Sequence, residues 1–173
     1  MSVNASNKNI LFRGNTLTTV GNALKVGDSF PQFQLVGTDM AEVTNSSFAG
    51  KIALFLVVPS LDTPTCQIET KRFNDEASEL SGEVVIPTVS VDLPFAQKRW
   101  CGAENVQRVI PLSDYKFRTF GEATGTYAQE MGLLVRAIFV TDRQQKIVHV
   151  EYVADISQEP NYEAALSAVR SLL

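Results

Sequence analysis

The strongest constraint on the fold is an apolar run at residues 52–58 that leads directly into a helix-start signal. The run, IALFLVV, contains no polar residue and is typical of a strand buried on both faces of a sheet. Thr63 suits a helix N-cap, and Pro64 suits the first helical position, where its missing N–H costs nothing. Five residues at helical spacing then predict one buried face: Cys66, Thr70, Phe73, Ala77 and Leu80. The pattern therefore predicts a buried strand followed by a helix that Gly82 can end.

The position of Cys66 in this helix predicts a reactive thiol. The cysteine lies in the first turn, so its sulfur sits beside backbone N–H groups that have no acceptor within the helix. These donors and the helix dipole favour a thiolate over a thiol. Two acidic neighbours, Asp62 and Glu69, would oppose the thiolate if they faced it, and we expect both to face away. The alternative is that Cys66 is a small buried apolar residue, which is the commonest fate of a free cysteine.

Bulk properties predict one cytoplasmic domain over residues 1–173. The chain carries a net charge of −4, and no basic cluster exceeds two residues, which argues against nucleic-acid binding. Its N-terminus lacks the apolar core of a signal peptide, and no apolar run approaches the ~20 residues that span a bilayer. No linker or internal repeat divides the chain. We therefore expect no membrane or nucleic-acid partner.

The small number of cysteine and histidine residues argues against several kinds of catalytic and metal site. Cys66 and Cys101 are the only cysteines, and in a cytoplasmic protein they are unlikely partners for a permanent disulfide. Such a bridge would stabilise the fold by ~4 kcal/mol, but a domain of this size does not need it, which favours a transient, catalytic disulfide. One histidine, His149, cannot complete a usual zinc site with two cysteines, and a Cys-His hydrolase would need it beside the sulfur. The absence of Cys-x-x-Cys argues against a thioredoxin-type dithiol exchanger.

The remaining elements predict an α/β chain with a thioredoxin-like layout. A β-hairpin at 9–20 should precede the β-α-β unit, whose second strand at 84–91 should run parallel to the first with a break at Pro87. A helix from Pro94 to about Gly102 should carry Cys101. The other expected elements are strands at 33–36, 109–112, 135–140 and 147–153, a helical turn at 44–48, a short helix at 114–122, a loop at 125–132 and a last helix at 160–173.

Two separate motifs carry a resemblance to a known family. The segment PSLDTPTC at 59–66 resembles the peroxidatic loop of the peroxiredoxins, whose pattern Pro-x-x-x-Thr-x-x-Cys is matched by Pro59, Thr63 and Cys66. The segment DLPFAQKRWCGAE at 92–104 is similar to the one that carries the second cysteine in bacterial thiol peroxidases, with tryptophan where relatives often have phenylalanine. With Arg136 before an apolar strand, the resemblance runs from about residue 10 to the C-terminus.

The resemblance implies an atypical two-cysteine peroxiredoxin with a thioredoxin-like fold and an N-terminal β-hairpin. Cys66 would be the peroxidatic cysteine, reducing H2O2 and alkyl hydroperoxides through a sulfenate, and Cys101 the resolving cysteine of an intramolecular disulfide. Thioredoxin would reduce that disulfide. The family works without metal, flavin or haem cofactors, and its members are commonly homodimers.

The resemblance also gives roles to individual residues. Thr63 and Arg136 would be catalytic, and the peroxide would bind to Pro59, Thr63, Thr65, Cys66 and Arg136. The residues alone leave a structural alternative open for each: Thr63 as a helix cap only, Arg136 as a strand-end residue with its head in water, and Cys101 as a buried helix residue. Two other functions stay open: a peroxide sensor that passes oxidation to a partner, and a thioredoxin-like interaction domain with inert cysteines.

Overall fold

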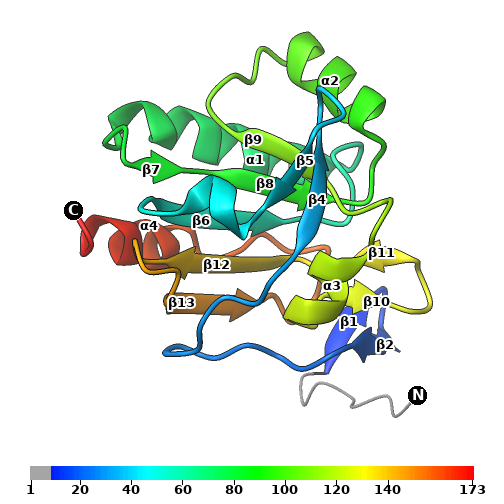
Figure 1. The fold of residues 1–173 in the computed structure, drawn as a ribbon. Coiled ribbons are helices and arrows are strands. Elements are labelled where there is room, and N and C mark those ends of the chain that lie inside the picture. The colour runs from blue at the N-terminus through cyan, green and yellow to red at the C-terminus, as the bar shows by residue number, and fades with distance from the viewer. Residues whose placement is uncertain (1–8) are drawn as a thin grey trace.

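A computed structural model describes residues 9–173, apart from the side chain of Ser78, and is built around one mixed β-sheet (Figure 1). The strand order is β13-β12-β6-β8-β9-β4-β5, with β7 also paired to β6. The bounds of these strands are β4 Gln34–Gly37, β5 Glu42–Thr44, β6 Ile52–Val57, β7 Val84–Val85, β8 Pro87–Ser90, β9 Ile110–Ser113, β12 Ala137–Thr141 and β13 Ile147–Tyr152.

Strand β6 is the centre of the sheet, as its apolar sequence predicts. All six of its residues are buried. It runs parallel to β8 and antiparallel to β12, with Leu56 paired to Thr88 and Ala137 paired to Val57. The predicted break in the second strand is confirmed, since β7 and β8 are separate and Pro87 is the first residue of β8, a position that proline tolerates.

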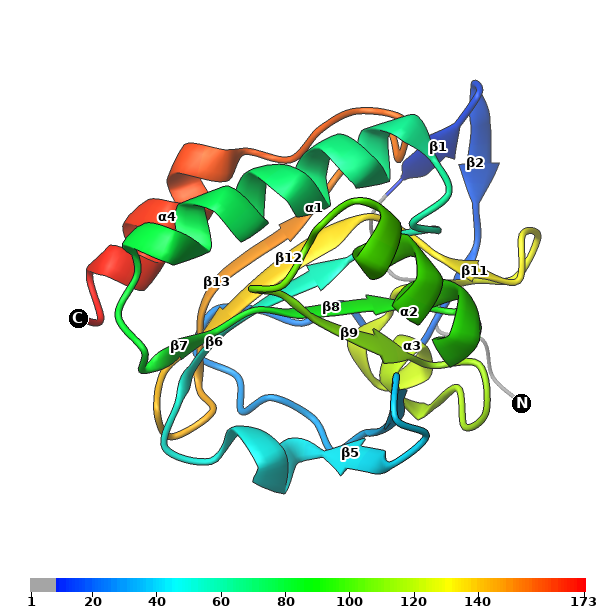
Figure 2. The same ribbon diagram turned by 90° about the horizontal axis from the view of Figure 1, so that it is seen from above.

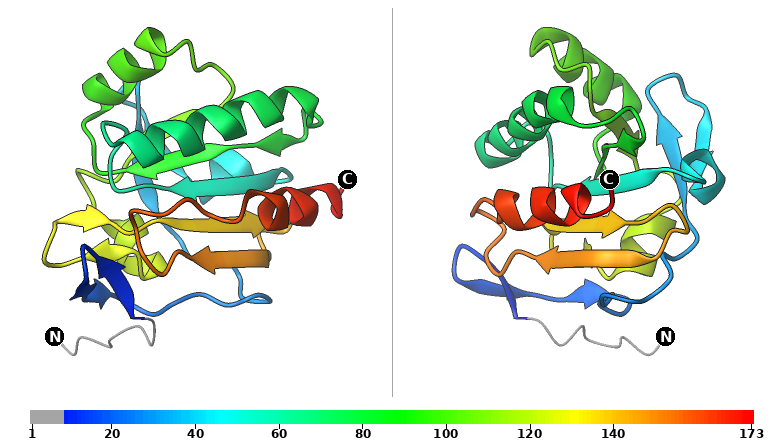
Figure 3. Two further views of the ribbon diagram at one scale, coloured as in Figure 1. Left: turned by 180° about the vertical axis from the view of Figure 1, so that it is seen from behind. Right: turned by 90° about the vertical axis from the view of Figure 1, so that its left-hand side faces the viewer.

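Helices α1 (Pro64–Glu76), α2 (Pro94–Ala103) and α4 (Tyr162–Arg170) cover one face of the sheet (Figures 2 and 3). An apolar cluster under them joins Cys66 and Phe73 of α1 to Trp100 of α2 and Leu166 of α4. Helix α3 (Thr119–Thr124) and the 3-10 turn η1 (Asn45–Phe48) cover the opposite face, where aromatic side chains dominate the core. The α/β prediction is therefore confirmed, and the Cys66 helix lies in the same layer as the Cys101 helix.

The N-terminal hairpin is confirmed, but its end belongs to a second small sheet. Strands β1 (Ile10–Phe12) and β2 (Asn15–Leu17) pair antiparallel. Strand β3 (Thr19–Val20) instead pairs with β10 (Tyr127–Ala128), which also pairs with β11 (Leu133–Leu134). The prediction of a plain loop at 125–132 is therefore wrong, because β10 lies within it.

Three helix boundaries differ from the expected ones. Helix α1 ends at Glu76 and continues as the 3-10 turn η2 (Ala77–Glu79), so it stops short of Gly82. The expected helix at 114–122 starts only at Thr119, because the buried Asp114 carboxylate accepts hydrogen bonds from the N–H groups of Phe120 and Gly121. The last helix starts at Tyr162, where the Asn161 side chain accepts from the N–H of Ala164. Between residues 9 and 173, no helix is long and apolar enough to cross a membrane.

Candidate active site

Cys66 lies at the start of α1, in the geometry that the sequence predicts. Its side chain is fully buried. Thr63 is the N-cap, and its hydroxyl accepts a hydrogen bond from the Cys66 N–H at 3.3 Å. Pro64 occupies the first turn without leaving a donor unpaired. The thiol is therefore fixed beside the positive end of the helix dipole and shielded from water.

Arg136 brings a cation to this sulfur. Its Nη2 donates to the Cys66 Sγ at 3.3 Å, and only 1% of its surface is exposed, so the interpretation of a strand-end arginine with its head in water is wrong. The pairing of Ala137 with Val57 explains the proximity, because the residue before β12 lies beside the end of β6 that leads to the Cys66 loop. Arg136 Nε and Nη2 also donate to the Ile156 carbonyl, at 3.1 and 3.0 Å, which fixes the guanidinium plane.

Glu69 also faces the site, and the expectation that it faces away is wrong. Its side chain is fully buried, and Oε2 accepts a hydrogen bond from Arg136 Nη1. Oε1 has no hydrogen-bond partner among residues 9–173. Burial raises the pKa of Glu69 to about 7, even though the Arg136 charge and hydrogen bond act in the opposite direction. The three-residue spacing from Cys66 was a usable signal, since i and i+3 share a helix face.

Arg136 stays positively charged in this pocket. Burial alone lowers its pKa, but the charges and hydrogen bonds of Glu69 and Cys66 outweigh that effect, so the net pKa is raised. A guanidinium is protonated at any physiological pH even without this help. The sulfur therefore has a permanent cation at hydrogen-bond distance.

The other residues of the predicted peroxide site line the same loop. The Thr63 hydroxyl donates to the Ser60 carbonyl at 3.1 Å while it accepts from Cys66, so it must rotate before it can donate to a substrate. Thr65 Oγ1 donates to the Ser157 carbonyl at 3.1 Å. Pro59 is buried at the end of β6, and Asp62 is exposed as expected.

Cys101 is a free thiol on α2, apart from Cys66 but packed against the same apolar cluster. The Cys101 side chain is half-buried, and burial raises the pKa of its thiol. A resolving thiol must become a thiolate to attack, so Cys101 is held in its less reactive form while α2 stays packed.

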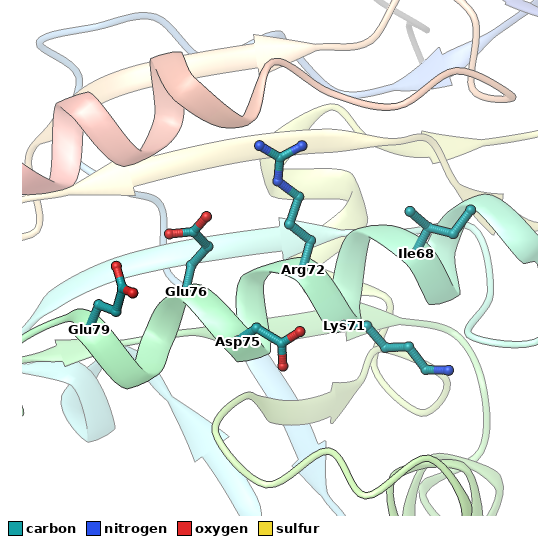
Figure 4. A pocket seen from close by; sticks show the side chains of 6 residues that line it. All are labelled: Ile68, Lys71, Arg72, Asp75, Glu76 and Glu79. Atoms are coloured by element: carbon teal, nitrogen blue, oxygen red, sulfur yellow. The ribbon is translucent and has the colours of Figure 1, made fainter.

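A metal-binding cluster and a surface groove were the other candidate sites in the part of the chain that the structure describes. Across residues 9–173, no group of three or more His, Cys, Asp or Glu side chains is placed to hold a metal ion. An open groove runs along α1 and η2, and Figure 4 shows its lining of Ile68, Lys71, Arg72, Asp75, Glu76 and Glu79. These side chains lie on the outer face of α1 and η2, whereas Cys66 and Glu69 are buried.

Comparisons with known proteins show the family of the chain. The redoxin family model matches residues 25–166. The thiol peroxidase of Clostridium acetobutylicum is 46% identical over 94% of this chain and 98% of its own length. The thiol peroxidase of Bacillus subtilis is 43% identical over 95% of this chain and 98% of its own. The chain belongs to the thiol peroxidases of the redoxin family.

A solved structure shows that the fold is also that of a peroxiredoxin. A peroxiredoxin-like protein from Aquifex aeolicus superposes with a TM-score of 0.89 at 38% identity, covering 95% of this chain and 96% of the other. The predicted thioredoxin-like peroxiredoxin fold is therefore confirmed. The thiol peroxidase is an enzyme of the peroxiredoxin type, and its buried Cys66–Arg136 pair is the natural candidate for its active site.

Proposed function

We propose that the Cys66 thiolate attacks the terminal oxygen of H2O2 or an alkyl hydroperoxide. The O–O bond breaks, the sulfur becomes a sulfenic acid, and the departing oxygen leaves as water or an alcohol after it takes up a proton. The observation that carries this proposal is the 3.3 Å hydrogen bond from Arg136 Nη2 to the Cys66 Sγ at a capped helix start. In this position, one guanidinium can stabilise the thiolate and also donate to the bound peroxide.

The second requirement is to stabilise the negative charge that develops on the departing oxygen. Lowering a thiol pKa raises its thiolate fraction at neutral pH only some tens-fold, and its nucleophilicity falls at the same time. The rest of the rate must come from donors fixed around the peroxide, each worth ~10²–10³ in rate. Arg136, the Thr63 hydroxyl and the backbone N–H groups of Thr65 and Cys66 would supply them, with Pro59 closing the pocket to water.

Cys101 of the same chain would then resolve the sulfenic acid. Its thiolate attacks the Cys66 sulfur, a 66–101 disulfide forms as the S–O bond breaks, and the sulfenic oxygen leaves as water after its hydroxide takes up a proton. The two cysteines belong to separate helices, α1 and α2, and neither is in a disulfide. A disulfide needs Cα atoms within ~7 Å, so we infer that one or both helices unwind locally in each cycle. Unwinding of α2 would also release Cys101 from the burial that raises its pKa.

We also propose that thioredoxin reduces this disulfide. Its dithiol would give up two electrons and two protons, restoring both cysteines in this chain. We further propose that the chain works as one domain, in the cytoplasm and as a homodimer, without a metal, flavin or haem. The high identity to bacterial thiol peroxidases over almost the whole chain supports these assignments.

Stopped-flow fluorescence tests the proposal. Trp100 is the only tryptophan, it precedes Cys101 on α2, and it packs in the apolar cluster that contains Cys66. Mixing the reduced protein with H2O2 or an alkyl hydroperoxide should give two phases, a peroxide-dependent oxidation and a peroxide-independent resolution. Cys66→Ser should abolish both phases and all turnover with thioredoxin and its reductase, because a hydroxyl offers essentially no anion near neutral pH. Substantial turnover in that variant would refute the assignment of Cys66.

A further inference from the structure

The carboxylate of Asp92 lies between the two cysteine segments and is bound by both the loop and the sheet. Its Oδ1 accepts from the Ser60 hydroxyl at 2.7 Å. Its Oδ2 accepts from the Leu61 N–H at 2.8 Å and from the Ser90 hydroxyl at 2.7 Å. Ser60 and Leu61 belong to the Cys66 loop, whereas Ser90 ends β8 and Asp92 itself leads into α2. One side chain therefore accepts two hydrogen bonds from the Cys66 loop and one from the end of β8, next to the start of the helix that carries Cys101.

The same hydrogen bonds extend into the helix that carries Cys101. Ser90 Oγ accepts from Gln97 Nε2 at 3.1 Å, and the same amide donates to the Leu112 carbonyl at 2.8 Å. Gln97 is fully buried and lies four residues before Cys101, on the same face of α2. A further link fixes the main chain, since the Ser113 hydroxyl donates to the Asp92 carbonyl.

Within the Cys66 loop, the same hydrogen-bond network reaches the reactive cysteine. The Thr63 hydroxyl donates to the Ser60 carbonyl at 3.1 Å and accepts from the Cys66 N–H at 3.3 Å. A continuous path therefore runs from Gln97 on α2, through Ser90 and Asp92, to the loop and to Cys66. When Thr63 rotates toward a bound peroxide, it gives up its bond to Ser60 and loosens one end of this path.

Apart from this network, few polar interactions fix α2 to the sheet. Leu93 is its N-cap residue and provides no side-chain cap. Two polar atoms of the helix, Gln97 Oε1 and Trp100 Nε1, are buried without a partner within residues 9–173. Unpaired buried groups favour any state in which they reach water. Helix α2 is therefore packed but easily released once its bonds near Asp92 are lost.

We propose that Asp92 is a positioning residue that couples release of the Cys66 loop to release of α2. Its role in catalysis rests on the proposed function, because the movement serves the disulfide step. While all three bonds of Asp92 are intact, both segments stay packed and Cys66 keeps its peroxide pocket. When the loop leaves, Asp92 loses two of its three partners, and the Ser90 hydroxyl that joins Asp92 to Gln97 is less firmly fixed, so α2 leaves more readily.

Hydrogen exchange of the reduced protein tests this coupling without any peroxide. Asp92→Ala should speed amide exchange about tenfold or more in two places together, residues 60–66 and α2, because bonds to a carboxylate are among the strong ones. Asp92→Asn should stay within about threefold of wild type. Its amide oxygen can accept from Leu61 and Ser90, and its NH2 can donate to the Ser60 hydroxyl. Unchanged exchange in α2 of Asp92→Ala would overturn the proposal.

Two further variants serve as a control and as a substitute for Asp92→Ala in the exchange experiment. Asp114→Ala removes another buried carboxylate, bound to the start of α3, and should leave exchange in both cysteine segments unchanged. If Asp92→Ala does not fold, Ser60→Ala removes the Oδ1 bond, together with the bond that the Ser60 hydroxyl accepts from the Asp62 N–H at 3.2 Å. It should still speed exchange in α2, and no change there would overturn the coupling. These measurements use reduced protein, so a failure of the peroxidase mechanism would produce neither result.

A kinetic readout separates coupling from simple destabilisation. After oxidation by H2O2, the resolution phase of Trp100 fluorescence should be about tenfold faster in Asp92→Ala than in wild type, with less over-oxidised Cys66 per turnover. Asp92→Asn should restore wild-type behaviour, and Asp114→Ala should not change this phase. Resolution at the wild-type rate in Asp92→Ala would contradict the proposal.

Discussion

Arg136 donates from Nη2 to the Cys66 sulfur at 3.3 Å, and both side chains are almost completely removed from water. The same guanidinium donates from Nη1 to the buried carboxylate of Glu69. The cation is therefore shared between a carboxylate and a sulfur, in an environment where charge interactions are stronger than at the surface. The proposed chemistry depends on this arrangement.

Arg136→Met should slow oxidation of Cys66 by ~10²-fold or more, because it removes a donor from the peroxide. Stopped-flow oxidation by H2O2 measures this rate. The single variant leaves Glu69 as an unpaired buried acid, so its stability should fall as well.

The double variant Arg136→Met/Glu69→Gln separates catalysis from folding. It removes both charges, so much of the lost stability should return. Oxidation should stay slow, because the donor is still missing. If the double variant regains the wild-type oxidation rate, Arg136 acts on the fold alone.

Glu69→Gln should change how stability depends on pH. Burial raises the pKa of Glu69 from 4.5 to about 7, so between these values the folded chain binds more protons than the unfolded chain. The contribution of Glu69 is therefore fully present below pH 4.5 and is lost as the pH rises toward 7. Relative to wild type, the free energy of unfolding of Glu69→Gln should rise across this window, by a few kcal/mol at most. Urea denaturation at several pH values measures it, and parallel curves for the two proteins would contradict the assignment.

Thr63→Val should cost ~1 kcal/mol in the free energy of unfolding, because the Cys66 N–H loses its cap. If the hydroxyl also binds the peroxide, the oxidation rate should fall by ~10²-fold. Thr63→Ser keeps the hydroxyl and should retain both stability and rate. A loss of stability alone in Thr63→Val would show that Thr63 caps the helix and does not bind substrate.

Local patterns predicted the elements that carry the site. The apolar run of β6, the Thr63–Pro64 helix start and the helix from Pro94 all form close to where the sequence puts them. Each has a signal within a few residues: an unbroken apolar run, a capping residue or a first-turn proline. The place of Arg136 beside the sulfur had no such local signal, and only the resemblance favoured an active-site role for it. No pattern in the sequence predicts its burial.

The features that the sequence did not predict depend on long-range contacts. Strands β3, β10 and β11 have two residues each, so only their pairing across the chain defines them. The Asp92 network joins groups more than thirty positions apart, from Ser60 in one loop to Asp92 in another. Glu69 is different, because its helix spacing from Cys66 already placed it on the buried face, and only the general preference of glutamate for solvent argued otherwise.

Cys101→Ser should separate the two chemical steps. Cys66 should still be oxidised at close to the wild-type rate, because Arg136 and Thr63 are untouched. The sulfenic acid should then persist, react with a dimedone-type reagent and over-oxidise under excess peroxide. Turnover with thioredoxin should collapse, and the slow Trp100 fluorescence phase should disappear. Normal turnover in this variant would make the protein a one-cysteine enzyme with Cys101 as a packing residue.

The most direct test of the whole account is the covalent state of wild type after one equivalent of H2O2. The reaction is quenched with an alkylating reagent, and the protein is analysed by non-reducing electrophoresis and by mass spectrometry of its peptides. We expect a species of monomer mass in which the peptides containing Cys66 and Cys101 are joined by a disulfide. A covalent dimer would place the resolving step between chains, and a monomer with both cysteines alkylated would mean that Cys66 does not react with peroxide.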